Sequence, residues 1–234
     1  MIVRDGWTFI IAGFLLTIII LISAIKWDSR WLLSISAIFA LLTLFTAFFF
    51  RDPERVSPPD PMSLVSTADG KIVAIKELED HPFIGGPALR ISIFLSVFDV
   101  HVNRTPAEGT IDYVKYNPGK FFAAFEDKAS DKNEQTEIGM TTKTGEKIVF
   151  TQIAGLIARR IVCNLTEGDL VNKGERFGLI RFGSRSDMII PNNSVINVKI
   201  GDMVTGGVTE IAYLKPIDRN NQHDKNVKSN NAEH

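Results

Sequence analysis

The sequence predicts a mainly β fold, a compact β-sandwich, preceded by an N-terminal hairpin of two membrane helices. Three observations support this prediction. Two long uncharged apolar runs fill most of the first fifty residues. Short apolar segments separated by Gly, Asn and Asp fill most of the remaining chain, which is the pattern of strands and turns. A turn-like pattern of Gly and Asp also occurs twice toward the C-terminal end.

The N-terminal hairpin is predicted from length and charge. Residues 7–25 and 31–50 contain no charged side chain, and a helix of about 20 residues crosses the hydrocarbon core of a bilayer. The short link 26–30 forces the two helices to be antiparallel. Tryptophans near the ends of both runs fit the headgroup region, which indole side chains prefer; they are Trp7, Trp27 and Trp31.

The two apolar runs have two alternatives to a spanning hairpin. A cleaved signal peptide requires a small-residue cleavage site, and none separates the two apolar runs. A hairpin that lies in one leaflet stays open. The positive-inside rule compares Arg4, Arg51 and Arg55 at the outer ends with Lys26 and Arg30 in the link. This small excess predicts the inner cell membrane, with the following domain on the cytoplasmic side.

Residues 51–215 form the predicted β domain. A polar, Pro-rich segment over 51–61 leaves the membrane, and 127–136 is expected to be an exposed polar loop. Residues 216–234 are rich in Asn, Asp and Lys, so we expect a disordered polar tail. The predicted strands are 71–76, 89–97, 109–116, 147–153, 157–164, 177–182 and 195–200.

One pattern is repeated within the β domain. Residues 168–174 and 201–207 both read Gly-Asp-apolar-Val-x-x-Gly. The glycines permit positive φ, so each copy is expected to be a tight turn between two strands. Such hairpins resemble those of lipoyl- and biotinyl-type β-sandwich domains, although two hairpins can share turn chemistry by chance. Either interpretation predicts a sandwich with pseudo-symmetric halves.

Composition excludes several classes of site. The net charge of −1 provides no basic field for nucleic acid. The single cysteine, Cys163, excludes a disulfide framework and a Cys-rich metal site, and no metal is expected. Its apolar neighbours predict that it is a small buried hydrophobic residue. No Gly-x-Gly-x-x-Gly or Walker A pattern indicates a site for an external nucleotide.

Two places could carry chemistry. His101 ends an apolar run from Ile93 and is followed by Asn103 and Arg104, and a scaffold holds polar groups rigidly at the end of a buried strand. Taken alone, such a histidine is more often structural. Gly183 and Ser184 form the only Gly-Ser pair in the chain, at an expected sharp bend between two strands. A glycine there permits a strained peptide that the serine hydroxyl can attack.

Residues 173–185 resemble the processing site of phosphatidylserine decarboxylases of the short form. Further segments agree in the same order, and an ordered set is more specific than any single match. The resemblance covers about residues 49–215. The agreeing segments are 49–53, 68–70, 98–106, 133–134, 153–155 and 158–162.

The resemblance implies a self-processing enzyme. Ser184 Oγ would attack the carbonyl carbon of Gly183, and β-elimination and hydrolysis would convert the serine to a pyruvoyl group, a covalent pyruvate cofactor. The chain would become fragments 1–183 and 184–234, which stay paired. The pyruvoyl would form a Schiff base with phosphatidylserine and accept the electrons released as CO2 leaves. The product would be phosphatidylethanolamine, in phospholipid biosynthesis.

The resemblance also implies roles for other residues. His101 would be the base for self-cleavage and later a proton donor, and Asp69 would orient it or participate directly. Asp69 could instead be a turn residue before Gly70. Longer relatives have a second histidine three positions after the first, where this chain has Arg104. One histidine must then do both jobs, and Arg104 is a candidate for binding the substrate's carboxylate or phosphate.

A phospholipid substrate would explain the membrane hairpin, because the enzyme would meet its substrate at the bilayer surface. Apolar residues at the mouth of the pocket are expected to enter the leaflet, with Phe121, Phe122 and Phe125 as candidates. A homo-oligomer is left open.

Other classes of protein share some of these features. A membrane hairpin before a lipoyl-like sandwich also describes adaptor subunits of efflux systems, but those need coiled-coil arms, and no sustained heptad pattern is present. A carrier domain needs a modified lysine at a hairpin tip, and Lys173 lacks the expected neighbours. A pyruvoyl decarboxylase of a soluble amino acid is a further alternative, which the membrane hairpin disfavours.

Overall fold

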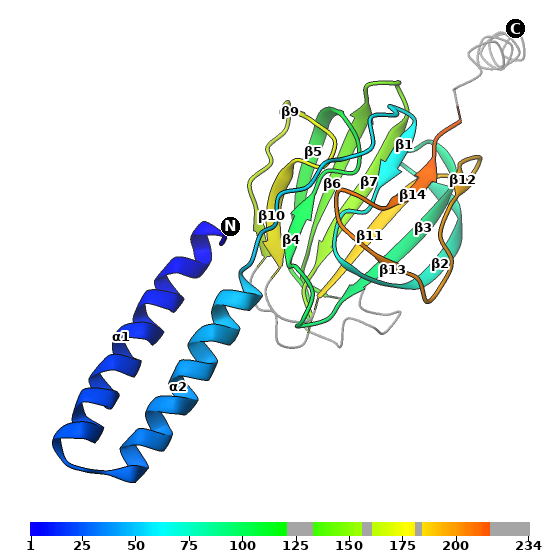
Figure 1. Ribbon diagram of the computed structural model, residues 1–234. Coiled ribbons are helices and arrows are strands. Elements are labelled where there is room, and N and C mark those ends of the chain that lie inside the picture. The colour runs from blue at the N-terminus through cyan, green and yellow to red at the C-terminus, as the bar shows by residue number, and fades with distance from the viewer. Residues whose placement is uncertain (121–132, 156–160, 181–183, 216–234) are drawn as a thin grey trace, which may run out of the picture.

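A computed structural model describes residues 1–120, 133–155, 161–180 and 184–215. Two helices, α1 (Arg4–Lys26) and α2 (Arg30–Phe49), project together from one end of a β domain (Figure 1). Both are long and apolar enough to cross a membrane, with mean hydropathies of 2.8 and 2.3 over their most apolar windows. The antiparallel helical hairpin is therefore confirmed, whereas its placement in a membrane stays a prediction.

Small residues bring the two helices close together. A Cβ atom at Gly13 would lie 2.6 Å from Thr43 Oγ1, so only glycine fits this crossing without a shift. Ser36 Oγ donates a hydrogen bond to the carbonyl oxygen of Thr17 at 3.3 Å. Close backbone approach and interhelical hydrogen bonds are the means by which helices associate where lipid removes the hydrophobic driving force.

The described strands form one sheet of eight strands and two sheets of three. The large sheet has the order β13-β2-β3-β11-β7-β6-β5-β9, and the small sheets are β1-β14-β12 and β4-β10-β8. The bounds are β1 (Ser63–Val65), β2 (Gly70–His81), β3 (Gly86–Leu95), β4 (Val102–Arg104), β5 (Gly109–Asn117), β6 (Gln135–Thr142), β7 (Lys147–Ile153), β8 (Ile161–Cys163), β9 (Leu170–Val171), β10 (Arg176–Ile180), β11 (Ser184–Pro191), β12 (Val195–Ile196), β13 (Met203–Val204) and β14 (Glu210–Tyr213).

These strands divide into two units of the same topology. In order, β1, β2, β3, β11, β12, β13 and β14 correspond to β4, β5, β6, β7, β8, β9 and β10. Each unit supplies half of the large sheet and one small sheet, and the units meet where β11 pairs with β7. The second unit is therefore inserted into the first, between β3 and β11.

The repeated Gly-Asp pattern follows this symmetry. The N–H of Ile111 donates to the carbonyl oxygen of Asp169, and the N–H of Ile72 donates to that of Asp202, both at 2.9 Å. Each copy contains the expected turn between two strands, at 172–175 and 205–208. It is not a hairpin, because the short strands β9 and β13 pair with β5 and β2 at the two opposite edges of the large sheet. The framing glycines all have positive φ, between 75° and 101°: Gly168, Gly174, Gly201 and Gly207.

The predicted mainly β class is confirmed, and every predicted strand overlaps an observed one. The likeness to lipoyl-type sandwiches stays a prediction. Cys163 packs against the main core but is only half-buried, and this burial raises the pKa of its thiol. The main core comprises Leu64, Ala68, Ile72, Ile91, Ile93, Leu95, Ala107, Ile111, Ile138, Met140, Ile148, Phe150, Val171, Phe177, Met188, Ile190, Val204, Ile211, Ala212 and Leu214.

The expected exposed loop over 127–136 is wrong at its C-terminal end. Asn133 and Thr136 are buried, and β6 begins between them. The inward alternation of Thr136 with apolar residues further along β6 is a strand pattern that the polar start concealed. Residues 127–132 of that loop and the tail 216–234 lie outside the described residues.

Gly109 provides a test of the packing between β5 and β6. A Cβ atom there would collide with the backbone oxygen of Thr141, which cannot move without breaking the sheet. We expect Gly109→Ala to lower the free energy of unfolding by about 2 kcal/mol, as overpacking does. Gly86→Ala is the control, because nothing lies within 4 Å of its Cβ position. Urea unfolding of the full chain in detergent should separate the two variants; equal stabilities would contradict this packing.

Candidate active site

His101 lies at the end of the connection from β3 to β4 and is 1% exposed. Its Nδ1 is 2.9 Å from the backbone carbonyl oxygen of Asp99, so Nδ1 carries the proton and donates it. Nε2 is buried and has no hydrogen-bond partner among the described residues. Burial lowers the pKa of His101 to about 4. The imidazole is therefore neutral at physiological pH, with a free electron pair on Nε2.

Ser184 is the first residue of β11 and is fully buried. Its backbone lies opposite Leu95, and its Oγ has no hydrogen-bond partner in the described part of the chain. At the end of β10, the N–H of Ile180 donates to the carbonyl oxygen of His101 at 3.4 Å. Residues 181–183 therefore connect Ile180, which is bonded to His101, to Ser184. These three residues, including Gly183, lie outside the described residues.

The two groups are chemically complementary. Buried polar atoms without a partner are uncommon in native proteins and need an explanation. A neutral imidazole nitrogen can accept the proton of a hydroxyl as that hydroxyl attacks a carbonyl carbon. Two segments join the inserted unit to the first unit: the β3–β4 connection, 96–101, and the β10–β11 connection, 181–183. His101 ends the first of these joints and Ser184 follows the second. The topology therefore brings both joints to the same end of the fold.

A buried polar network that the sequence did not reveal surrounds the start of β11. Thr67 Oγ1 and Ser186 Oγ share a hydrogen bond of 2.7 Å. Asn103 Nδ2 donates to the carbonyl oxygen of Thr67 at 3.5 Å, and Gln152 Nε2 donates to Asn103 Oδ1 at 2.9 Å. Ser186 lies two residues after Ser184 and therefore on the same face of β11. Of the members of this network, the sequence interpretation named only Asn103, among the polar residues after His101.

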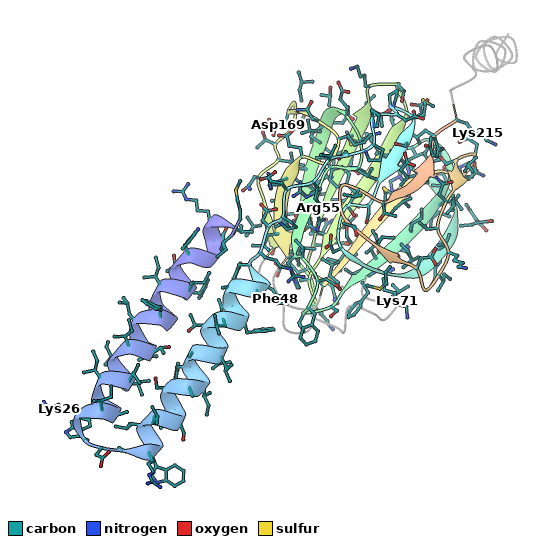
Figure 2. The ribbon with its side chains drawn as sticks, viewed as in Figure 1. Lys26, Phe48, Arg55, Lys71, Asp169 and Lys215 are labelled. Atoms are coloured by element: carbon teal, nitrogen blue, oxygen red, sulfur yellow. The ribbon has the colours of Figure 1, made fainter. Side chains whose placement is uncertain are left out.

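Asp69 is held by Arg55 rather than by His101. Arg55 Nη1 and Nη2 contact the two carboxylate oxygens at 2.5 and 2.8 Å, and the N–H of Gly206 donates to Oδ1 at 2.8 Å. In this structure the orienter of His101 is the Asp99 carbonyl. The charge of Asp69 still raises the pKa of His101, against the larger effect of burial. Its role in catalysis stays a prediction. Figure 2 labels Arg55 within the β domain.

Arg104 is buried and makes structural contacts. Its Nη1 donates to the carbonyl oxygen of Gly174 at 3.0 Å, and its Nη2 donates to Asp52 Oδ1 at 3.0 Å and to the carbonyl oxygen of Pro53 at 2.9 Å. These bonds attach the exit from α2 to the β domain. Substrate binding by Arg104 is untested, and these contacts do not support it.

Arg185 was also missed by the sequence interpretation. It follows Ser184, is fully buried, and points to the opposite face of β11. Its Nε contacts Asp187 Oδ1 at 2.6 Å, and its Nη2 donates to Ser92 Oγ at 2.5 Å. A buried charge is tolerated only when it is paired, and Asp187 supplies the pair, while the bond to Ser92 connects Arg185 to the neighbouring strand β3.

The fold and site define a class of protein: a mainly β enzyme with a buried hydroxyl and an unprotonated imidazole, behind two helices apolar enough to cross a membrane. Comparisons with known proteins identify it further. The sequence model of the family described as "Phosphatidylserine decarboxylase" matches residues 42–212. The chain belongs to this family and is a carboxy-lyase. The adaptor and carrier alternatives do not agree with this membership.

Three relatives share the name "Phosphatidylserine decarboxylase proenzyme". The protein from Symbiobacterium thermophilum is 44% identical, with 91% of this chain and 95% of the relative covered. The protein from Desulfotalea psychrophila is 50% identical, with 76% and 83% covered. The protein from Magnetococcus marinus is 42% identical, with 92% and 96% covered. The match therefore extends along most of both chains.

The state of His101 can be measured directly. We expect its imidazole to titrate with a pKa of about 4 in the folded chain, because burial disfavours the charged form. NMR of the full chain in detergent micelles, with labelled histidine, should report this value. The unfolded chain, with a His pKa of about 6.5, is the control. The unfolded chain then binds more protons between these pH values, so the unfolding free energy should fall as pH decreases from about 6.5 to about 4. A folded-state midpoint near 6.5 would contradict the burial of the ring.

The structural role of Arg104 predicts a stability effect. Arg104→Ala should lower the free energy of unfolding by about 3 kcal/mol, because it removes buried bonds to Asp52 and two carbonyl groups. Lys143→Ala is the control, since the Lys143–Glu108 ion pair is exposed and should contribute less than about 0.5 kcal/mol. Urea unfolding of both variants measures the difference. A tolerated Arg104→Ala would show that Asp52 is satisfied without it.

Proposed function

We propose that this chain is a proenzyme that cleaves itself between Gly183 and Ser184 and then decarboxylates phosphatidylserine to phosphatidylethanolamine. The observation that carries the proposal is the buried Ser184 hydroxyl, which has no hydrogen-bond partner in the described residues. Ser184 follows Ile180 closely in the chain, and the N–H of Ile180 donates to the carbonyl oxygen of His101. Membership in the decarboxylase family and the word proenzyme in the names of relatives support it.

Self-cleavage begins with a proton transfer. His101 Nε2 accepts the proton of Ser184 Oγ as that oxygen attacks the carbonyl carbon of Gly183, and gives this proton to the peptide nitrogen, which leaves as the amine of Ser184. The product is an ester of Gly183 with Ser184. Loss of the α-proton of Ser184 then breaks its Cβ–Oγ bond, which releases Gly183 as a carboxylate. Addition of water to the remaining dehydroalanine releases ammonia and leaves a pyruvoyl group at the start of 184–234.

The surroundings of Ser184 fit such a group. Decarboxylation of an amino acid needs an electron sink that ordinary side chains do not supply, and a pyruvoyl carbonyl supplies it. The buried site excludes bulk water, and the Thr67–Ser186 bond holds the strand two residues further on. His101 is available as the proton donor after its first task. The lack of a metal in the reaction stays a prediction.

The strand pairing supports the expectation that the two fragments remain together. β11 pairs with β3 from Ser184 to Pro191 and with β7 from Arg185 to Ile189. A cut before Ser184 therefore leaves the small fragment in the middle of the large sheet, where backbone hydrogen bonds on both sides retain it.

A contact with α2 indicates which part of the β domain would lie at the membrane surface. Phe98, in the joint that ends at His101, is 65% exposed, and its ring packs edge-on against Phe45 of α2 at 6.3 Å. Phe98 is therefore our candidate for insertion into the leaflet. The earlier candidates, Phe121, Phe122 and Phe125, lie outside the described residues. We retain the inner membrane and the cytoplasmic side as part of the proposal.

The cleavage is tested by mass. The wild-type chain of 26.0 kDa should separate into pieces of about 20 and about 6 kDa, the smaller without a free amino terminus. Ser184→Ala should remain intact because the attacking oxygen is gone, and Ser186→Ala, a buried serine on the same face, should still separate. Intact-mass measurement of the purified proteins provides the result. Two fragments from Ser184→Ala would exclude this mechanism.

Substrate and base need separate tests. Vesicles containing phosphatidylserine should release CO2 with the wild-type protein, whereas free serine should not; the reverse would favour the soluble amino acid alternative. His101→Ala should process far more slowly than wild type, since it removes the base. Normal processing by His101→Ala would transfer the role of base to another residue.

A further inference from the structure

The end of the helical hairpin is built into the β domain. The N–H of Val3 donates to the carbonyl oxygen of Phe50 at 2.9 Å, and the N–H of Asp52 donates to that of Met1 at 2.7 Å. These bonds join the start of α1 to the end of α2. Phe49, Phe50 and Leu179 form one buried cluster, which includes β10 just before the proposed cleavage site. Figure 2 labels Phe48 at this junction.

The last residue of α2 reaches His101 directly. The ring of Phe49 lies 4.1 Å from the imidazole, centroid to centroid, at an interplanar angle of 37°. Both side chains are 1% exposed. If the two helices only anchored the β domain, a flexible linker would be sufficient and no contact with the proposed base would be needed.

The joint that carries His101 is also held by the hairpin. Arg51 Nη2 donates to the carbonyl oxygen of Phe98 at 2.7 Å, and its Nη1 donates to that of Phe48 at 2.9 Å. The guanidinium lies over the Phe48 ring at 3.8 Å. Arg51 therefore fixes the loop from the side of α2, while Asp99 fixes the imidazole from within the loop.

We propose that Phe49 is a positioning residue for His101, so that the membrane hairpin completes the active site as well as anchoring it. The inference rests on the proposed function, because it assigns to His101 the role of base. Phe49 restricts rotation of the imidazole and excludes water from its face. The Asp99 carbonyl selects the tautomer with the proton on Nδ1, whereas the buried Phe49 ring keeps water from the imidazole, so Nε2 is left unprotonated and fixed in direction.

Burial of His101, more than the charged groups around it, determines the direction of the expected change in its pKa. Burial lowers its pKa most, the hydrogen bond to the Asp99 carbonyl raises it, Arg51 lowers it, and Asp69 raises it. The Asp99 carboxylate accepts a hydrogen bond from the N–H of Ser96 at 2.8 Å, and burial raises its own pKa. Replacing the Phe49 ring by a smaller side chain admits water, so the pKa of His101 should rise toward about 6.5.

The test compares Phe49→Leu with Phe50→Leu. Both remove a buried ring from the same cluster, but Phe50 stacks on Phe9 at 5.9 Å and packs against Phe49, and has no described ring contact with His101. Each variant is made in the full Ser184→Ala chain in nanodiscs, and the titration of His101 is followed by NMR. We expect Phe49→Leu to raise the pKa by about one unit or more and Phe50→Leu to leave it near 4.

A second measurement follows processing at neutral pH. In chains that retain Ser184, pulse–chase labelling in membranes should show cleavage slowed several-fold by Phe49→Leu and little changed by Phe50→Leu. Vesicle flotation checks that both variants are membrane-bound. An unchanged His101 pKa in Phe49→Leu, or equal shifts in both variants, overturns the positioning role. A wild-type chain that never cleaves overturns the proposed function instead, and the titration still reports on Phe49.

Discussion

Backbone pairing of β11 with both β3 and β7 is the constraint on which the rest of the site depends. This strand lies inside the large sheet, and seven of its eight residues are buried. Because side chains alternate along a strand, a slip of one residue would turn Ser184 to the other face and break the hydrogen bond from Arg185 to Ser92 of β3. The register therefore sets the place of the proposed nucleophile, and the same hydrogen bonds would retain the small fragment after cleavage.

The buried charges near the site are paired, and this pairing is consistent with a neutral His101. An unpaired carboxylate near the imidazole would favour its protonated form. Asp69 is instead bound by both guanidinium nitrogens of Arg55, so part of its field is compensated. Asp52 is similarly shared between Arg104 and Arg176. The base then depends mainly on burial, to which the end of α2 contributes through Phe49.

The sequence predicted the elements better than their contacts. Uncharged length was sufficient for α1 and α2, and a short apolar run after turn residues was sufficient for β7, whose bounds were predicted as observed. The same rule missed β6, because polar residues begin that strand. At the site, the Gly-Ser pair and His101 were predicted from motif and resemblance. Gln152 and Thr67 were not, since a lone polar residue in a strand has no local signal for a buried network.

The sequence by itself determined the helical hairpin, the mainly β class, the repeated Gly-Asp turns and membership in a decarboxylase family, because these depend on local periodicity, backbone freedom and residue order. Only the tertiary structure decided that Asp69 pairs with Arg55, that Arg104 fastens the exit of the hairpin, and that Phe49 lies on His101. Those contacts join segments far apart in the chain, and sheet register together with the cost of burying unpaired charge selects among the possible partners.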